Sequence, residues 1–278
     1  MTHDHHVPVD VTVKFTLVRH GESLDNLRSV WAGWRDSDLS NHGKAQAEAL
    51  ARSYANTSLT VIYTSPLKRA YTTAEVLQNA QAVPIPLYTS PLLREQNFGR
   101  GEGQPYHVRK EPGLSLAEHI AKGKYPATHK RSQRFPDGES LDDVARRADQ
   151  VVRDILLPYV SKAVEEGTHG IHVVVVSHGI FIGELIASLL RLGGGKTETS
   201  YRGLRNTGRV LVTVTAKRDT EERSADTDFL RVRIVQYNAC GHLDGLVRQK
   251  GGIGSAAYDP NQKDIRSFFQ PVKGSRAK

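Results

Sequence analysis

The chain has very little sulfur and no long apolar stretch. Its single cysteine, Cys240, excludes an internal disulfide framework and any paired-cysteine redox or zinc motif. No apolar run approaches the roughly 18 residues of a membrane span, and the N-terminus lacks the basic and then apolar order of a secretory signal. We therefore expect a soluble, cytoplasmic protein that does not interact with a membrane.

The composition is that of an ordinary globular protein with an excess of positive charge. Of its 278 residues 38% are hydrophobic and 24% are charged, and the net charge is +8. This charge favours anionic partners. The basic residues neither alternate with aromatic residues nor line one helix face, so we expect a small phosphorylated molecule rather than nucleic acid. Nothing in the sequence indicates an oligomeric state.

Strand and helix patterns alternate along the chain. Helices are predicted after Ser40, after the pair Ser65-Pro66, after Ser140 and over residues 180–192. Strands are predicted over residues 11–18, 59–63, 83–89, 171–176, 209–216 and 229–237. The alternation predicts an α/β fold, a three-layer α/β/α sandwich whose mostly parallel, mixed central sheet carries helices on both faces.

Three segments are expected to lie outside the main domain or to cover it. Residues 1–10 are predicted to be a flexible arm, residues 11–247 a single α/β domain, and residues 248–278 a C-terminal tail. Within the domain, residues 99–136 have no sustained apolar face and many charges, which is typical of a lid over a site. The charged loop 217–228 is expected to be mobile, and the glycine-rich stretch 251–255 is interpreted as flexible tail.

Two of the predicted strands end in the same way. His20 and Gly21 follow the first strand, and His178 and Gly179 follow the strand over residues 171–176. Reactive groups in open α/β sheets gather outside the carboxyl ends of the strands, so neighbouring strands would bring both imidazoles to one pocket. The glycines allow close approach of the backbone, and amides at the helix starts donate to anionic oxygens. The repeated pattern predicts an anion-binding catalytic site.

Three further residues fit such a site. Arg69, near a helix start, provides a bidentate donor for phosphate oxygens; Glu95 provides a carboxyl group that can transfer a proton; and Asn26 lies close to His20 in sequence. Each also has an ordinary explanation when taken alone: a solvated arginine, a surface carboxylate paired with Arg94, or an asparagine in a turn. Their joint presence is what supports the site.

The ordered set of motifs resembles the histidine phosphatase superfamily, the phosphoglycerate-mutase-like proteins. The segments that carry the resemblance are Arg19-His20-Gly21-Glu22-Ser23 with Asn26, Gly33-Trp34 with Asp36 and Ser40, Thr64-Ser65-Pro66 with Arg69, Leu93-Arg94-Glu95, Gly138-Glu139-Ser140, and Ser177-His178-Gly179. The resemblance spans residues 15–246 and implies a phosphoglycerate-mutase-like fold. Residues 92–99, 206–208 and 242–246 are also similar to the TIGAR-type sugar bisphosphatases within that superfamily.

The resemblance implies a mechanism with a covalent intermediate. His20 would attack phosphorus and form a phosphohistidine, while Glu95 protonates the leaving oxygen and then acts as base for water. The catalytic set implied by the resemblance is His20, Glu95, His178, Arg19 and Arg69, and the substrate-binding set is Arg19, Asn26, Gly33, Arg69 and Gly179. No metal and no cofactor are expected: the histidines of the N-terminal tip, His3, His5 and His6, are interpreted as incidental, the rest of the chain has no HxH or HExxH motif, and an arginine adjoins His20.

Hydrolysis of a small phosphorylated metabolite, a sugar bisphosphate or a similar phosphomonoester, is the expected function. A phosphoglycerate-mutase-type phosphotransferase remains the main alternative, although Ala32 stands where mutases usually carry a hydroxyl residue. A non-catalytic binding relative is a further alternative, although no expected site residue is missing. The lid carries basic residues that favour a second anionic group on the substrate: Arg100, Arg109, Lys110, Lys122, Lys124, Lys130 and Arg131.

Overall fold

A computed structural model gives the fold of the chain and describes residues 10–128, 130–195, 201–216 and 230–260. The predicted arm as far as residue 9, the predicted mobile loop 217–228 and the tail beyond residue 260 lie outside the described residues.

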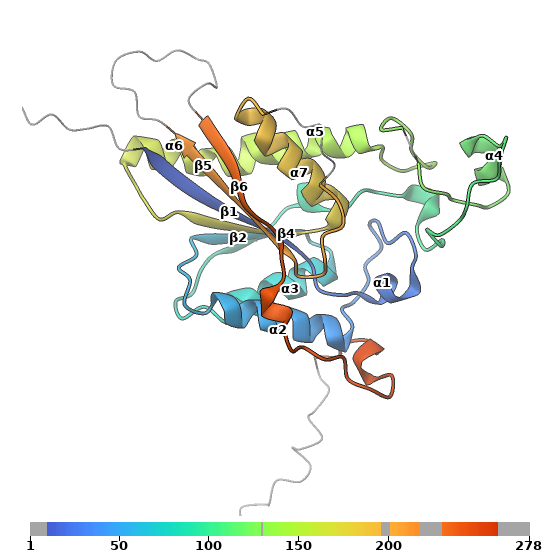
Figure 1. The fold of residues 1–278 in the computed structure, drawn as a ribbon, viewed down its shortest axis with the longest axis horizontal. Coiled ribbons are helices and arrows are strands. Elements are labelled where there is room, and N and C mark those ends of the chain that lie inside the picture. The colour runs from blue at the N-terminus through green and yellow to red at the C-terminus, as the bar shows by residue number, and fades with distance from the viewer. Residues whose placement is uncertain (1–9, 129, 196–200, 217–229, 261–278) are drawn as a thin grey trace, which may run out of the picture.

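The centre of the molecule is a six-stranded mixed sheet (Figure 1). Its strands are β1 (Val11–Arg19), β2 (Val61–Thr64), β3 (Leu87–Thr89), β4 (His172–Ser177), β5 (Arg209–Ala216) and β6 (Leu230–Ala239). They lie in the order β3-β2-β4-β1-β5-β6, in which the first four are parallel and β5 is antiparallel to both β1 and β6. All of β4 is buried, as its continuous β-branched run predicts for a central parallel strand.

Helices cover both faces of this sheet. The covering helices are α2 (Asn41–Tyr54) and α3 (Lys68–Asn79) on one face, and α5 (Leu141–Val151), α6 (Leu157–Glu166) and α7 (Gly179–Leu192) on the other (Figure 1). A π-helical turn, Val152–Leu156, joins α5 to α6. The predicted three-layer α/β sandwich is therefore confirmed.

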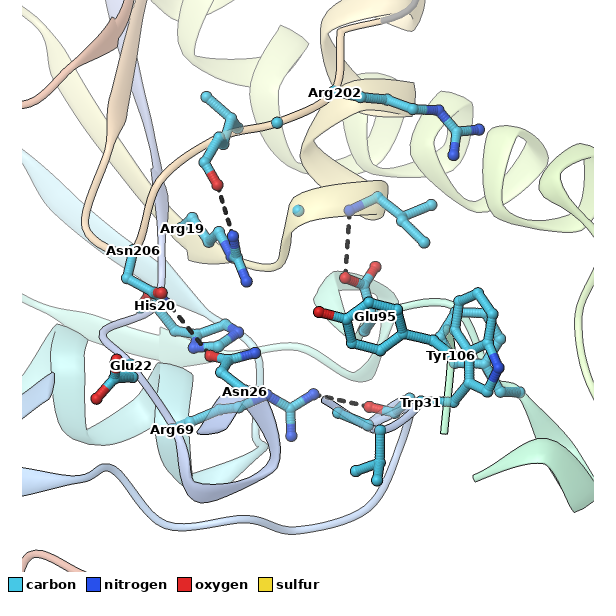
Figure 2. Close-up of a pocket in the computed structure, with 18 residues that line it drawn as sticks. Arg19, His20, Glu22, Asn26, Trp31, Arg69, Glu95, Tyr106, Arg202 and Asn206 are labelled. Atoms are coloured by element: carbon cyan, nitrogen blue, oxygen red, sulfur yellow. Dashed lines mark hydrogen bonds between the residues drawn. The ribbon is translucent and has the colours of Figure 1, made fainter. Parts of the chain in front are cut away.

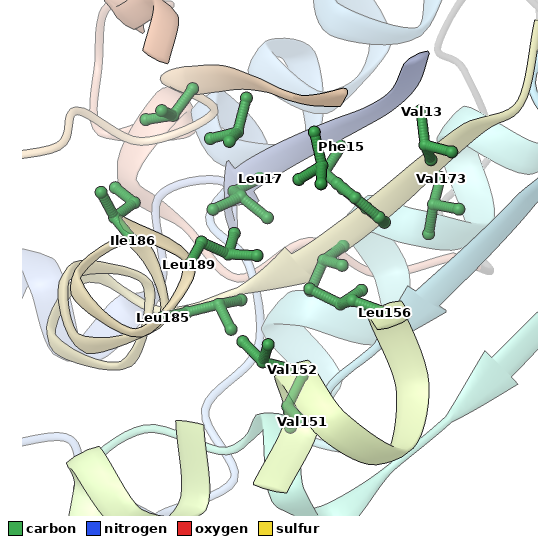
Figure 3. Close-up of a cluster of buried hydrophobic side chains, with 14 of the residues drawn as sticks. Val13, Phe15, Leu17, Val151, Val152, Leu156, Val173, Leu185, Ile186 and Leu189 are labelled. Carbon is green, nitrogen blue, oxygen red and sulfur yellow. The ribbon is translucent and has the colours of Figure 1, made fainter. Parts of the chain in front are cut away.

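The two helical layers enclose separate apolar cores, because successive strand residues face opposite sides of the sheet. Phe15, Leu17 and Val173 pack with side chains of α5, α6 and α7 (Figure 3). Val18 and Val174 instead pack with α2 and α3. With both faces of β1 and β4 buried, the carboxyl ends of these two strands are held firmly beside each other.

Two of the predicted helix starts are confirmed and one is wrong. Ser40 caps α2, and Ser140 forms a capping box at the start of α5. Helix α3 begins at Lys68 with Leu67 as its N-cap and no side-chain cap, so Ser65 does not cap it. The Ser65 hydroxyl group is instead engaged with the ring of His178, at 2.9 Å.

The remaining helical elements are short. The helix α1 (Leu24–Arg28) follows β1, and α4 (Leu116–Ala121) lies in the predicted lid, residues 99–136. Single 3₁₀ turns occupy Pro91–Leu93, Gly99–Gly101, Gly241–Leu243 and Ile253–Ser255. None of the described helices combines the length and the apolar character that crossing a bilayer requires.

The described part of the tail, residues 248–260, packs on the start of α2. The amide of Asn41 donates to the carbonyl of Ala256, and the amide of Tyr258 donates to the carbonyl of Leu39, both at 2.9 Å. The 251–255 stretch, interpreted from sequence as flexible, contains the last 3₁₀ turn and lies within this packed segment. The tail thereby reaches the same edge of the sheet as His20.

Candidate active site

A cavity of about 500 Å³ opens beyond the carboxyl end of β1 (Figure 2). Its described lining includes seven residues predicted from the sequence: Arg19, His20, Asn26, Gly33, Arg69, Glu95 and Gly179. They come from the end of β1, the helix α1 and the loops on either side of it, the first turn of α3, the loop after β3 and the first turn of α7. The topology thus brings together residues that are up to 160 positions apart in sequence.

The ring of His20 is held in one tautomer. Its Nδ1 lies 2.6 Å from the carbonyl oxygen of Gly21, which only accepts, so Nδ1 carries the proton and Nε2 keeps its lone pair. Burial, together with the neighbouring guanidinium groups of Arg69 and Arg19, lowers the pKa of His20 well below its usual value. At neutral pH the imidazole is uncharged, as a nucleophile must be.

His178 lies against His20. The two ring centroids are 5.0 Å apart, and His178 is fully buried with Nε2 bonded to the hydroxyl group of Ser65. Burial, followed by the charge of Arg69, lowers the pKa of His178 well below its usual value. The two histidines are brought together as predicted, but His178 is not among the residues that line the cavity. Its direct contact with a phosphate stays a prediction.

Two guanidinium groups lie beside His20, that of the buried Arg69 and that of the partly buried Arg19. Arg69 is 1% exposed, and its terminal nitrogens donate to the carbonyl groups of Arg35 and Gly33, both at 2.7 Å. Arg19 donates to the carbonyl group of Leu204. The Nε atoms of Arg19 and Arg69 are buried without a hydrogen-bond partner among the described residues. Buried donors of this kind are normally satisfied, so the pair is suited to an anionic ligand.

Glu95 is fixed by the first turn of α7. Its carboxylate accepts from the amides of Phe181 at 3.0 Å and Ile180 at 3.2 Å, and from its neighbour Gln96 at 3.0 Å. Arg147, on α5, donates to the carbonyl group of Glu95 at 3.1 Å and to the carbonyl groups of Leu92 and Arg94, both at 2.7 Å. Sequence analysis missed Arg147 because a charged residue on an amphipathic helix carries no signal that it points inward.

Residues 15–227 match the histidine phosphatase superfamily, branch 1. The chain belongs to this superfamily. It is 33% identical over 262 residues to a probable phosphatase of Schizosaccharomyces pombe, covering 92% of this chain and 80% of that one. It is also 33% identical over 177 residues to a probable phosphoglycerate mutase of Yersinia pestis, covering 63% and 74%. The solved structure of a protein named mycobacterial hydrolase 1 covers 82% of this chain, with 26% identity and a TM-score of 0.62.

Membership of the histidine phosphatase superfamily confirms the resemblance seen in the sequence at that level. The comparisons give nothing specific to the TIGAR-type sugar bisphosphatases, so that narrower resemblance stays a prediction. Within the described residues, no three His, Cys, Asp or Glu side chains gather as a metal site would require. That the reaction uses no metal is likewise a prediction.

The predicted role of the basic lid residues is not supported by their positions. None of the seven lines the cavity. Lys122 and Lys124 pair with Glu111, and Arg131 pairs with Glu184 at 2.8 Å. These ion pairs join parts of the lid to each other and the lid to α7.

The described lining also contains residues that sequence analysis did not propose for the site: Glu22, Val30, Trp31, Ala32, Phe98, Tyr106, Ile180, Arg202, Gly203, Leu204 and Asn206. Asn206 belongs to a segment noted for its resemblance to the sugar bisphosphatases. Its side-chain Nδ2 donates to the carbonyl group of His20 at 3.1 Å. The aromatic members gave no sequence signal, because isolated aromatic residues in loops have no periodicity.

Glu22 brings a negative charge to the rim of the cavity. Arg248, from the tail, donates to both oxygens of its carboxylate, at 2.9 and 2.5 Å, and Ser40 donates at 2.7 Å. Burial by itself raises the pKa of Glu22, but the hydrogen bonds from Arg248 and Ser40 outweigh it and leave the pKa below its usual value. Arg248 therefore compensates a charge that would repel a phosphate.

Proposed function

We propose that the protein is a phosphatase that hydrolyses small phosphomonoesters through a phosphohistidine at His20. The observation that carries the proposal is the state of this residue: a buried, neutral imidazole with its Nε2 lone pair available, beside the buried Arg69 and the partly buried Arg19. A metabolite phosphate is the anionic partner that these charges suit, and the S. pombe relative, itself named a probable phosphatase, supports the same class of reaction.

The first step forms the phosphohistidine. Nε2 of His20 donates its lone pair to phosphorus, the bond from phosphorus to the ester oxygen breaks, and that oxygen takes a proton from Glu95. Arg19, Arg69 and the amide of Gly179 hold the three remaining oxygens while charge redistributes among them. Glu95 is placed for this step by its bonds to the start of α7.

The second step restores the enzyme. Water attacks the phosphorus atom, Glu95 takes the proton of that water, and the bond from phosphorus to Nε2 breaks, so inorganic phosphate leaves and His20 regains its lone pair. Over the proposed cycle the water replaces the proton that Glu95 gave to the leaving oxygen, so Glu95 ends in its starting state. Asn26 and Gly33 lie in the same wall and are proposed to contact the bound ester.

A phosphotransferase of the mutase type is the second candidate, favoured by the likeness to a probable phosphoglycerate mutase. Such an enzyme must hold the product while the phosphoryl group returns to another hydroxyl group. Ala32 in the lining and the outward pairing of the lid cations argue for hydrolysis instead. The narrower expectation of a sugar bisphosphate rested on those cations, so the geometry supports the broader class of phosphomonoesters.

A phosphate-release screen over phosphorylated metabolites tests the proposal. We expect release by the natural protein and by His169→Ala, since His169 is exposed and outside the cavity, and loss of release in His20→Ala. Release that persists in His20→Ala contradicts the proposal. Transfer of phosphate between two metabolites without release would assign the protein to the mutases.

A further inference from the structure

The cavity has two chemically different halves. The inner half holds the charged groups around His20. The outer half is lined by side chains that are mostly apolar, Val30, Trp31, Ala32, Phe98, Tyr106 and Ile180, together with the cation Arg202. Figure 2 shows Trp31 and Tyr106 side by side on the wall across from Arg19 and His20, with the Tyr106 hydroxyl group directed into the cavity. An ester bound with its phosphate in the inner half must place its alcohol portion against this wall.

The aromatic wall is a packed cluster. The ring centroids of Trp31 and Phe98 are 4.5 Å apart, and those of Trp31 and Tyr106 are 5.8 Å apart. Phe135 lies behind them, 5.8 Å from Trp31 and almost perpendicular to it. Such tilted and edge contacts are the favoured arrangements of aromatic rings. The wall therefore presents a firm apolar surface rather than loose side chains.

Backbone hydrogen bonds fix where these rings stand. The amide of Trp31 donates to the carbonyl group of Gln104 at 2.9 Å, and the amide of Gly103 donates back to Trp31 at 2.8 Å. The amide of Tyr106 donates to Ser29 at 3.2 Å, and the indole N–H of Trp31 donates to the carbonyl group of Tyr125 at 2.9 Å. The loop after β1 and the lid are thus joined by backbone hydrogen bonds around an isolated antiparallel bridge, Val30 with Pro105, which holds the subsite in place before a ligand binds.

We propose that this outer half is a subsite for a flat, apolar leaving group, so that the enzyme favours phosphomonoesters whose alcohol carries an aromatic ring. The inference rests on the proposed phosphatase activity and narrows its substrate class. Stacking and burial against Trp31, Phe98 and Tyr106 stabilise an aromatic ring, whereas a polyol would lose water at this wall and gain little beyond a hydrogen bond to the Tyr106 hydroxyl group.

Two esters with alcohols of nearly equal acidity separate this subsite from the chemistry of the leaving group. In 2-phenylethyl phosphate the ring is two carbons from the ester oxygen, so its intrinsic reactivity is close to that of ethyl phosphate. We expect kcat/KM for 2-phenylethyl phosphate to exceed that for ethyl phosphate by about 10- to 100-fold, the discrimination typical of a filled apolar pocket. The value of kcat/KM for 2-phenylethyl phosphate should also exceed that for fructose 1,6-bisphosphate.

Variants of Tyr106 test whether the aromatic wall causes the difference in kcat/KM between the two esters. Tyr106→Leu should reduce the ratio between the two esters several-fold, and Tyr106→Phe, which keeps the ring, should retain it. Tyr71→Leu is the matched control, because Tyr71 is 38% exposed like Tyr106 but lies outside the cavity. We expect no change of either rate in that control.

Binding measured without turnover keeps the inference separate from the proposed function. If the metabolite screen and both esters show no phosphate release, the proposed function fails, but calorimetric titration still compares 2-phenylethylphosphonate with ethylphosphonate. About tenfold tighter binding of the aromatic phosphonate supports the subsite. Equal binding of the two phosphonates, a rate ratio near one, a faster reaction of the sugar bisphosphate, or a ratio unchanged in Tyr106→Leu would overturn it.

Discussion

The inner and outer halves of the cavity differ in what supports them. The inner half is built from β1 and the first turns of α3 and α7, elements that are packed between two apolar cores. The outer half is built from the loop after β1 and the lid, which are joined to each other by backbone hydrogen bonds. The comparison indicates that the proposed chemistry depends on the layered sheet, while the choice of leaving group depends on two loops that can vary independently of it.

The largest effect is expected from the inner half. Glu95→Gln should lower kcat by about 10²- to 10⁴-fold for both 2-phenylethyl and ethyl phosphate, because the glutamine cannot protonate the leaving oxygen. The ratio between the two esters should not change. The loss in kcat/KM, which reports the first step alone, should be much smaller for 4-nitrophenyl phosphate, whose leaving group needs no proton. Steady-state kinetics over pH checks this role, and unchanged limbs of the pH profile in Glu95→Gln would refute it.

A second variant tests the support behind Glu95. Arg147 is 10% exposed and pairs with Glu139, which is 19% exposed, so Arg147→Ala leaves a largely buried carboxylate without its cation. We expect a loss of about 3 kcal/mol in the free energy of unfolding and a lower kcat at an unchanged ester ratio. Urea unfolding and kinetics measure both. Arg146→Ala, whose side chain is 70% exposed on the same helix, is the control and should leave stability nearly unchanged.

The positive charge of Arg248, in the tail, is expected to strengthen substrate binding in the inner half of the cavity. Arg248→Ala leaves the Glu22 carboxylate uncompensated at the rim, so KM should rise about fivefold, corresponding to roughly 1 kcal/mol, with little change in kcat. Removing both charges, in Glu22→Gln combined with Arg248→Ala, should restore most of the affinity. Lys250→Ala is the control from the same segment. A KM that stays high in the double variant would point to packing of the tail instead.

The smallest expected effect is on the pH dependence of the free energy of unfolding, and it involves no residue that lines the cavity. Burial, followed by the charge of Lys14, lowers the pKa of His172 to about 4, and the ring bonds the hydroxyl group of Thr16 at 2.8 Å. Below pH 6.5 the unfolded chain binds a proton that the folded chain resists, so stability falls as pH drops from 6.5 towards 4.

His172→Gln should make that fall shallower, while the exposed His169→Gln should not. Urea unfolding at several pH values within the window measures the difference. The slope should not disappear, since burial also lowers the pKa of His20 and of His178. An unaltered slope in His172→Gln would show that this residue titrates normally in the folded protein.

The sequence predicted the inner half far better than the outer half, for a physical reason. Strand periodicity placed His20 and His178 at strand ends, and the sheet order then had to bring those ends together. The prediction that Ser65 caps a helix was wrong, because the Ser65-Pro66 pattern is equally compatible with the hydrogen bond that the Ser65 hydroxyl group makes to His178. Tyr106 and Arg147 were missed because their positions depend on contacts between segments distant in sequence, which periodicity does not record.

The phosphorylated state of His20 is the most direct test of the account. Rapid mixing of the natural protein with 2-phenylethyl phosphate, quenching in base and mass spectrometry of the peptides should show one phosphoryl group on His20 that disappears as inorganic phosphate is released. His20→Ala should show no such adduct and no release. Turnover at the normal rate with no phosphoryl group on His20 at any time, or with one on another residue, would contradict the account.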